Sequence, residues 1–318
     1  MSSAVVVQNR TEKSNEPRVC VIIPTKNRAS DLAIAVHSLL GQTVLPAQVV
    51  IVDQSSDDSS FELVKTEFAT APGVRLDYIR DTSLNGAAAA RNRAMDSATG
   101  EFWLFLDDDV VLEPEFIVRL LEAYSDHPEA VGMSGIITNY RPSPLPQRLW
   151  SALFARGPFR DERQPIYWAA EQLRNGEPHR VRQFTGAVMS FRASTIRERR
   201  FDSNHPGALA EDTDFCWRLP AGTRLLLTPR ARLVHNRSPQ GRARDHWLRA
   251  HAQGFYYLYE RNLKHGIRNR IFFAWLNVGY AIALGATCAK RRTLEGWRAL
   301  SAGRSAGKTY ANPKGSSA

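Results

Sequence analysis

Short apolar runs alternate with amphipathic segments through the first third of the chain. Val19 to Ile23 is a continuous apolar run rich in β-branched residues, which predicts a strand buried on both faces. Similar runs cover Val49 to Val52, Val74 to Tyr78 and Phe102 to Leu106, and segments with helical periodicity lie between them. This alternation predicts a doubly wound, mostly parallel α/β sheet. Such a sheet binds its ligands beyond the carboxyl ends of its strands.

The pattern changes between Tyr140 and His179. Several prolines and aromatic residues interrupt the alternation there, which favours an inserted loop over the site or an acceptor surface. Regular structure is expected to resume at Gln183 to Phe191, and a helix is expected to begin near Glu211. Two further short strands are expected, at Arg224 to Leu227 and Arg232 to His235.

Composition excludes several classes of protein. The chain has 318 residues, of which 43% are apolar and 23% charged, so it is neither disordered, collagenous nor a small disulfide scaffold. Cys20, Cys216 and Cys288 are far apart and lack metal-ligand spacing, which favours a reducing, cytoplasmic setting. Residues 1–18 are polar and have no apolar core of signal-peptide length, so we expect a disordered leader.

Positive charge is concentrated at the C-terminal end. Residues 237–318 contain 15 Lys and Arg against 3 Asp and Glu, which leaves the rest of the chain slightly acidic. Within this basic tail, Ile271 to Ala289 carries no charge and would form a helix about 28 Å long, close to the thickness of a bilayer core. We therefore expect a helical tail that docks on an anionic membrane surface, peripherally or with marginal insertion, rather than on nucleic acid. The alternative is a helix packed on the sheet.

Three consecutive carboxylates follow the fourth apolar run. Asp107, Asp108 and Asp109 would repel one another strongly if they were buried without a cation. A divalent ion held by one or two carboxylates together with phosphate oxygens resolves this repulsion. A solvated acidic turn remains the alternative.

Six short motifs occur in an order that points to one family. They are Val21 to Arg28, Ile51 to Asp58, Asn85 to Asn92, Gly100 to Asp109, Thr185 to Met189 and Glu211 to Phe215. Together they resemble the family 2 glycosyltransferases, an inverting family, across Val19 to His235. The resemblance implies a GT-A, Rossmann-like catalytic domain over residues 19–236. Residues 19–139 would form its nucleotide-sugar half and residues 140–236 its acceptor half, and the basic tail would occupy residues 237–318.

The resemblance assigns the donor-binding residues by position. Asp53 would contact the nucleobase, and Arg91 would reach the nucleotide. The other residues expected to bind the donor are Pro24, Thr25, Asn27, Arg28, Gly86, Asp107 and Asp108. From the residues alone, Arg91 could equally form a surface ion pair.

The resemblance also implies a metal and a catalytic base. Asp109 and Asp107 would hold Mg²⁺ or Mn²⁺, and His235 would complete the metal shell. Asp212 would be the catalytic base. Gly186, Glu211 and Asp214 would lie on the acceptor side, the last two as rival bases. Read without the resemblance, Asp212 could stabilise a helix N-terminus, and His235 could be a core histidine.

The expected activity is the metal-dependent, inverting transfer of one sugar from a nucleotide-diphosphate sugar to a hydroxyl. The acceptor would be a glycan or lipid-linked molecule of surface polysaccharide synthesis, at the cytoplasmic face of the cell membrane. The Gln-x-x-Arg-Trp motif of processive synthases is absent, which favours transfer of a single sugar. The alternatives are a sugar-phosphate nucleotidyltransferase and an inactive sugar-nucleotide-binding membrane scaffold.

Overall fold

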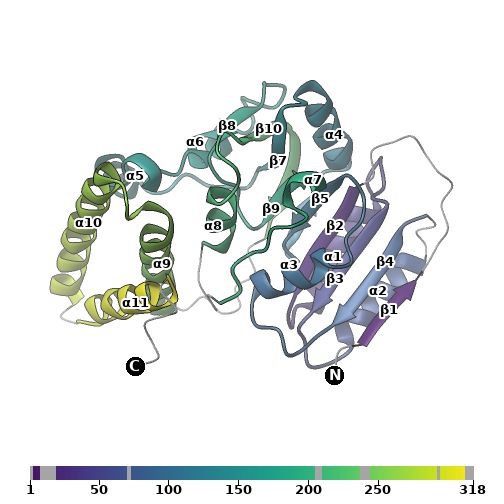
Figure 1. Ribbon diagram of the computed structural model, residues 1–318, viewed down its shortest axis with the longest axis horizontal. Helices are drawn as coiled ribbons and strands as arrows, with labels where there is room; N and C mark the ends of the chain where they lie inside the picture. Colours follow the sequence, from purple (N-terminus) through teal and green to yellow (C-terminus); the bar gives the residue numbers. More distant parts are fainter. Residues whose placement is uncertain are drawn as a thin grey trace. The chain divides into compact units, whose positions relative to one another are not determined.

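A computed structural model describes residues 3–7, 19–69, 73–204, 210–236, 244–291 and 294–311 (Figure 1). The chain forms two compact units. Unit 1 comprises Met1–Tyr140, Pro165–Ser203 and Leu219–Ser238, and unit 2 comprises Arg141–Gln164, Asn204–Arg218 and Pro239–Ala318. The expected acceptor half, residues 140–236, is therefore divided between the two units.

Unit 1 is built on one sheet. Its central parallel strands are β2 (Val19–Thr25), β3 (Gln48–Asp53), β4 (Arg75–Arg80) and β5 (Phe102–Leu106). Every residue of β2, β3 and β5 is buried, as the continuous apolar runs predict. The mostly parallel α/β fold expected from the sequence is confirmed.

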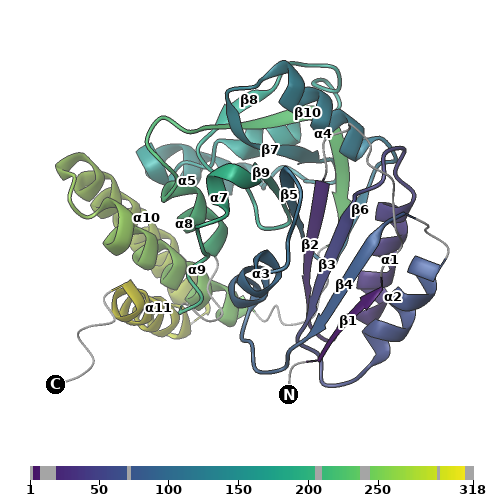
Figure 2. The same cartoon turned by 45° about the vertical axis from the view of Figure 1, so that its right-hand side comes forward.

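Helices cover both faces of the parallel strands. Helices α1 (Ala29–Leu40) and α2 (Ser59–Ala69) lie beside one face and α3 (Ala87–Met95) beside the other (Figure 2). Further along the chain, α4 (Phe116–Asp126) packs on β7 (Ala130–Ile137) and β10 (Arg224–His235), which are parallel to each other. The short helix α7 (Ala193–Ile196) contacts β9, and the short helix α6 (Arg163–Trp168) begins in unit 2 and ends in unit 1.

Antiparallel strands extend the sheet. They are β1 (Ser3–Val7), β6 (Val110–Leu112), β8 (His179–Val181) and β9 (Val188–Arg192). The strand order is β1-β4-β3-β2-β5-β9-β7-β10-β6, and β8 pairs with β10. Since β9 lies between β5 and β7, it joins the two parallel groups into one sheet.

The structure departs from the sequence expectations at two strands. Ser3–Val7, expected within a disordered leader, pairs with β4 because its three consecutive valines suit an edge strand. The rest of the expected leader, residues 8–18, lies outside the described residues. The two strands expected at Arg224–Leu227 and Arg232–His235 form the single strand β10, whose register against β7 shifts between those segments.

Unit 2 is helical in its described part. Residues expected to form an inserted loop contain α5 (Leu145–Phe154) and the 3₁₀ turn η1 (Gly157–Phe159). The remaining elements are α8 (Glu211–Trp217), α9 (Arg244–Leu258), the π-helical turn η2 (Tyr259–Leu263), α10 (Ile267–Arg291) and α11 (Glu295–Ala311). Ala155, Phe159, Tyr256, Phe273 and Leu276 form an apolar cluster that holds η1, α9 and α10 together.

Two glycines allow α9 and α11 to approach closely. A Cβ atom at Gly303 would lie 2.4 Å from the carbonyl oxygen of Arg249, and one at Gly307 would lie 2.5 Å from that of Gln253. Both glycines are buried in this contact. Where the chain is described, no helix combines the length and apolar character needed to cross a membrane.

Candidate active site

The acidic tripeptide lies between β5 and β6, at the carboxyl end of β5. Asp108 points toward the end of β2, where the hydroxyl of Thr25 donates to its Oδ2 at 2.7 Å and Arg28 Nη1 donates to its Oδ1 at 3.0 Å. Burial raises the pKa of Asp108 to about 6, against the opposing effect of these two donors. Asp108 therefore links the acidic turn to the loop after β2.

Asp107 and Asp109 form a separate group with His235. One ligand atom from each of the three residues lies within 4.8 Å of the others. The imidazole Nε2 of His235 is 3.0 Å from Asp109 Oδ1, and the Asp109 side chain is only 2% exposed. Two carboxylates and an imidazole are donors that a divalent ion accepts, so these residues fit a metal. The alternative for the three aspartates, a solvated acidic turn, does not match the burial of Asp109.

The antiparallel pair β6 and β10 brings this group together. Val110 lies opposite His235 in the ladder, and the backbone N–H of Asn236 donates to the carbonyl of Asp109 at 2.9 Å. Strand pairing thus places His235 beside Asp109, although the two residues are 126 positions apart in the sequence.

Arg91 holds Asp107 from the other side. Its guanidinium Nη2 donates to Asp107 Oδ1 at 3.0 Å and to the carbonyl of Gly186 at 3.1 Å. The side chain is 1% exposed and stacks near the ring of Phe201. Arg91 therefore forms a buried ion pair rather than the surface pair that its sequence alone left open. Gly186, expected on the acceptor side, contributes its backbone to this contact.

The loop after β2 is shaped by the neighbouring strands. Asn27 adopts a φ of 55°, and its backbone N–H donates to the hydroxyl of Ser55 at 2.7 Å. Ser55 in turn donates its N–H to Asp53 Oδ1 at 2.8 Å, and the hydroxyl of Tyr78 donates to Asp53 Oδ2 at 2.5 Å. Pro24, which precedes this loop, is buried within β2 opposite Val52 of β3.

Asp53 has no exposed surface, and both of its carboxylate oxygens accept hydrogen bonds from within the protein. Its observed contacts organise the turn after β3. Contact with a nucleobase, which the resemblance implies, requires the carboxylate to become accessible and stays a prediction.

Gly86 precedes α3 and has a φ of 88°, a conformation that favours glycine. Its N–H donates to the side-chain oxygen of Gln54 at 3.0 Å. A Cβ atom at Gly86 would meet nothing within 4 Å, so backbone conformation rather than crowding accounts for a glycine here.

The expected acceptor-side acids lie in the first turn of α8, within unit 2. Asp214 has no exposed surface and accepts hydrogen bonds from Arg218 Nε at 2.7 Å and Asn262 Nδ2 at 3.0 Å. Asp212 is partly exposed, and its Oδ1 accepts the N–H of Thr213 at 2.6 Å. Glu211 is also partly exposed. Asp214 thus ties α8 to η2, which does not suit the role of rival base.

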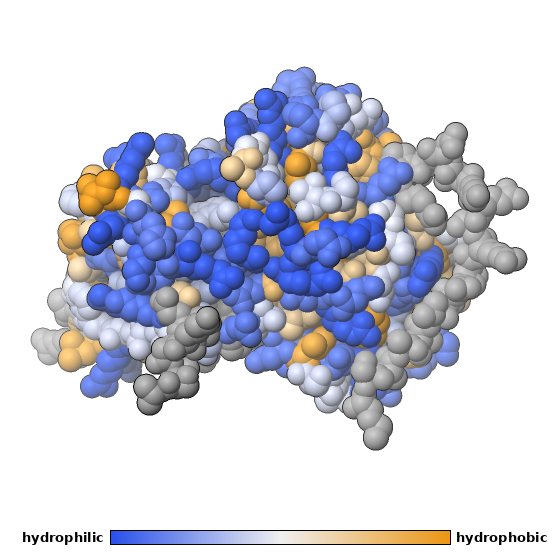
Figure 3. Space-filling model, in the orientation of Figure 1, coloured by the Kyte–Doolittle hydropathy of each residue, from blue (hydrophilic) through white to orange (hydrophobic). Residues whose placement is uncertain are grey.

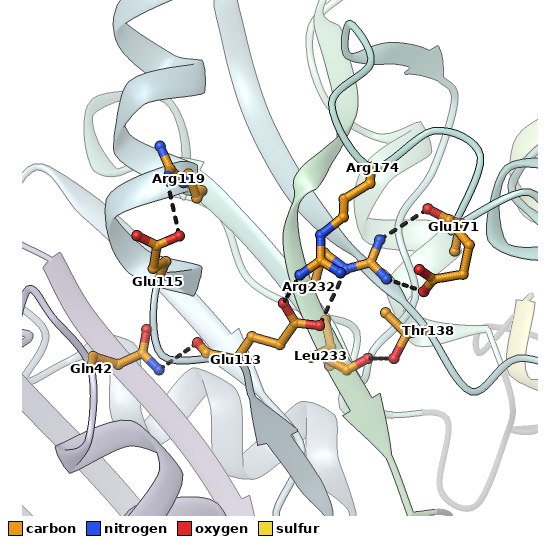
Figure 4. A network of polar contacts seen from close by, with 10 residues as sticks. Gln42, Glu113, Glu115, Arg119, Thr138, Glu171, Arg174, Arg232 and Leu233 are labelled. Atoms are coloured by element: carbon orange, nitrogen blue, oxygen red, sulfur yellow. Dashed lines mark hydrogen bonds and ion pairs between the residues drawn. The ribbon is translucent and has the colours of Figure 1, made fainter.

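A buried arginine anchors the far end of the β6–β10 pair (Figure 4). Arg232 is 3% exposed and contacts the carboxylates of Glu113, at 3.2 Å, and Glu171. It also donates to the carbonyl of Ala170 at 2.9 Å. Glu113 directly follows β6 and Arg232 lies in β10, so the ion pair fixes the two strands that carry Asp109 and His235.

Sequence reasoning missed the supporting residues Gln54, Ser55, Tyr78 and Arg232. Gln54 and Ser55 directly follow Asp53, so the motif from Ile51 to Asp58 could have assigned them a supporting role as well. Tyr78 could have been found from strand order, because β4 lies parallel to β3 and brings it near Asp53. No local signal marks Arg232, whose partners are distant in sequence.

Comparison with known proteins decides the family. The family model of glycosyl transferase family 2 matches residues 20–195, which is more than half of the chain. The chain belongs to glycosyl transferase family 2. This confirms the expectation drawn from the six motifs.

Curated relatives match a similar part of the chain. The chain is 30% identical over 226 residues to a pre-mycofactocin glycosyltransferase of Mycobacterium tuberculosis. This match covers 70% of the chain and 43% of the relative. The chain is 28% identical over 227 residues to the succinoglycan biosynthesis protein ExoM of Rhizobium meliloti, covering 70% of this chain and 67% of the relative. The chain therefore spans less than half the length of the mycobacterial relative.

Solved structures share the fold. The mannosyltransferase PcManGT from Pyrobaculum calidifontis, in complex with GDP-Man and Mn²⁺, aligns with a TM-score of 0.59 at 19% identity, covering 95% of this chain and 87% of that one. Residues 1–349 of TarS from S. aureus align with a TM-score of 0.58 at 15% identity, covering 93% and 82%. The expected GT-A fold class is thereby confirmed.

Proposed function

We propose that this chain is an inverting glycosyltransferase that moves one sugar from a nucleotide-diphosphate sugar to a hydroxyl, with Mg²⁺ or Mn²⁺ as cofactor. The observation that carries the proposal is the convergence of Asp107, Asp109 and His235 at the carboxyl end of β5 in a family 2 fold. The family favours this reaction over nucleotidyl transfer.

Asp107, Asp109 and His235 would hold the metal. A divalent ion bound by these residues would supply positive charge to a leaving diphosphate. Arg91 keeps Asp107 in place through a buried ion pair, and Arg28 adds a cation 3.0 Å from Asp108 and 3.8 Å from Asp109. These two arginines therefore offset only part of the charge of the three adjacent carboxylates, and the negative charge that remains favours a bound cation.

Asp212 would accept the proton of the attacking hydroxyl. It is partly exposed, whereas Asp214 is buried against Arg218 and Asn262 and is occupied by them. A base on the acceptor side, opposite the leaving group, gives inversion at the anomeric carbon.

The acceptor would be a glycan or lipid-linked molecule of surface polysaccharide synthesis, handled at the cytoplasmic face of the cell membrane. One relative is named for succinoglycan biosynthesis, and others are named for PGL/p-HBAD biosynthesis. The basic C-terminal segment supports a location at an anionic membrane surface.

A panel of nucleotide sugars tests the proposal. Each would be incubated with the chain and Mn²⁺, with release of nucleoside diphosphate and thermal stabilisation measured together. We expect one or a few donors to stabilise the chain and to be turned over, and the product formed with an added acceptor to have the inverted anomeric configuration by NMR. Stabilisation without any turnover would instead identify a sugar-nucleotide-binding scaffold, and retention would contradict the mechanism.

A further inference from the structure

One side of α10 is apolar and exposed. Ile267, Ile271, Trp275, Val278 and Ile282 are between 42% and 71% exposed. At the rotation of an α-helix, their spacing places all five within an arc of about 80°. The opposite side of α10 carries the buried residues of the unit 2 cluster, so this stripe faces away from the core.

Helix α5 carries a second stripe of the same kind. Leu145, Leu149 and Leu153 recur every fourth residue and are 63%, 61% and 49% exposed. They fall within another arc of about 80° on their helix. The sequence expectation of a docking tail did not include this helix.

The two stripes adjoin each other. The indole Nε1 of Trp275 donates to the carbonyl of Leu153 at 2.9 Å, and its ring lies 5.2 Å from that of Phe154. On the neighbouring turn, Trp150 donates to the carbonyl of Gly279 at 2.9 Å. Together the eight exposed residues of α5 and α10 form one surface, which we call the apolar face. Figure 3 shows hydrophobic residues of unit 2 exposed among polar ones around α10.

An apolar groove opens on this face. It has a volume of about 580 Å³ and is lined by Ile271, Phe272, Ala274, Trp275, Val278 and Arg156. Only Arg156 among these carries charge, and it is exposed. The groove thus offers apolar walls with a guanidinium beside them.

The segments that carry the apolar face contain charge of one sign only. Residues 141–160, which include α5 and η1, contain four arginines and no acid, and residues 261–294, which include α10, contain seven Lys or Arg residues and no acid. Arg148, Arg156, Arg268 and Arg270 are exposed beside the stripes. A protein partner needs no such uniform charge, whereas an anionic headgroup layer over acyl chains matches both the charge and the apolar stripes.

We propose that the apolar face of α5 and α10 docks on an anionic lipid bilayer, with both helices lying in the headgroup region and an acyl chain entering the groove. The proposal rests on the membrane-surface location included in the proposed function, and on no step of the reaction. It assigns contact to α5 as well as to the tail, and it requires no membrane crossing.

Flotation of the full chain with vesicles tests this proposal. The vesicles would be phosphatidylcholine alone or phosphatidylcholine with about one-third phosphatidylglycerol, without donor sugar. We expect binding to the anionic vesicles that weakens with salt. The double variant Leu149→Ser/Ile271→Ser should bind them at least about tenfold more weakly, because two apolar side chains that would be buried in lipid are lost.

Two further double variants separate the effect of the apolar face on vesicle binding from general effects of substitution. Ile34→Ser/Leu63→Ser removes two comparably exposed apolar side chains from unit 1 and should leave vesicle binding unchanged. Arg148→Gln/Arg268→Gln should reduce the preference for anionic vesicles. Thermal melting of each variant would establish that it is folded.

Two results would overturn the proposal. One is equal vesicle binding by the folded Leu149→Ser/Ile271→Ser variant and the unchanged chain. The other is absence of binding to the anionic vesicles at low salt. A dimer that this variant disrupts, seen by sedimentation velocity, would then identify a second copy of the chain as the occupant. The vesicle assay contains no donor sugar, so its result does not depend on whether the chain transfers sugar. Donor turnover is measured in a separate assay without vesicles, so loss of vesicle binding does not decide it.

Discussion

Two aspartates on one turn of α8 have different surroundings. Asp214 has no exposed surface and is bound by Arg218 and Asn262, whereas Asp212 is partly exposed. Burial and pairing make Asp214 a structural residue, and accessibility makes Asp212 the better candidate for proton transfer.

Substitution of each aspartate separates these roles. Asp212→Asn should lower the kcat of sugar transfer by about 10²-fold or more without changing donor affinity or Tm, because only the base is lost. Asp214→Asn should lower the free energy of unfolding by about 2 kcal/mol, because charged hydrogen bonds to a buried group are lost. Kinetics and thermal melting of both variants provide the measurement. A folded Asp214→Asn variant with crippled turnover, beside a normal Asp212→Asn variant, would reverse the assignment.

At the residue scale, sequence motifs located the carboxylates but not their partners. The position of Asp107 and Asp109 after a buried strand predicted that they lie at a strand end, as they do. Asp53 shows how far sequence motifs can predict the contacts of a site residue. Its hydrogen bond from Tyr78 depends on the pairing of β3 with β4, which no local pattern records.

At the scale of elements, the pair β6 and β10 positions the candidate metal ligands. Arg232 fixes one end of the pair through Glu113, and the backbone of Asn236 fixes the other through Asp109. The ion pair is buried on the arginine side, so loss of Arg232 removes the cation that joins Glu113 to Glu171.

Arg232→Met should therefore weaken Mn²⁺ binding by about tenfold or more, the scale found for residues that orient metal ligands. Arg224→Met is the matched control. Arg224 begins the same strand but is 54% exposed, is paired with Glu129 and lies at the opposite end of the strand from His235. Calorimetric titration with Mn²⁺, beside thermal melting, measures both effects. If Arg232→Met lowers Tm yet binds Mn²⁺ normally, Arg232 stabilises the strands without positioning the site.

The contact of α9 with α11 depends on small residues. Gly303→Ala should lower the Tm, because the added Cβ atom would lie 2.4 Å from a backbone oxygen that cannot move independently. Gly285→Ala is the control: its nearest neighbour would be 4.0 Å away, and alanine favours a helix by up to about 1 kcal/mol, so the Tm should rise or stay level. An unchanged Tm for Gly303→Ala would show that α9 and α11 do not pack this closely.

Elements with continuous apolar runs could be predicted, and elements defined by pairing could not. The buried runs of β2, β3 and β5 were evident because both faces of these strands are covered. The three-residue strand β6 carries too little pattern to be recognised, although its pairing with β10 builds the site. Residues 141–160 looked irregular because prolines mask the periodicity of α5.

At the scale of the whole molecule, the candidate catalytic metal site and the basic apolar surface belong to different parts of the chain. The expected metal ligands and Arg91 lie in unit 1, whereas the basic apolar face lies in unit 2. Overall composition predicted a basic tail but gave no indication that α5 shares its surface.

Metal-dependent nucleotide binding is the central claim, and calorimetry on one variant tests it most directly. UDP and GDP would be titrated into the unchanged chain and into Asp109→Asn, with Mn²⁺ or with a chelator, and Asp126→Asn would serve as an exposed control. We expect Mn²⁺ to raise the affinity of the unchanged chain for one of the diphosphates by about tenfold or more, and the control to match it. Asp109→Asn, with an unaltered fold, should show the weak affinity seen with chelator whether or not Mn²⁺ is present. Full Mn²⁺-dependent affinity in that variant would contradict the account.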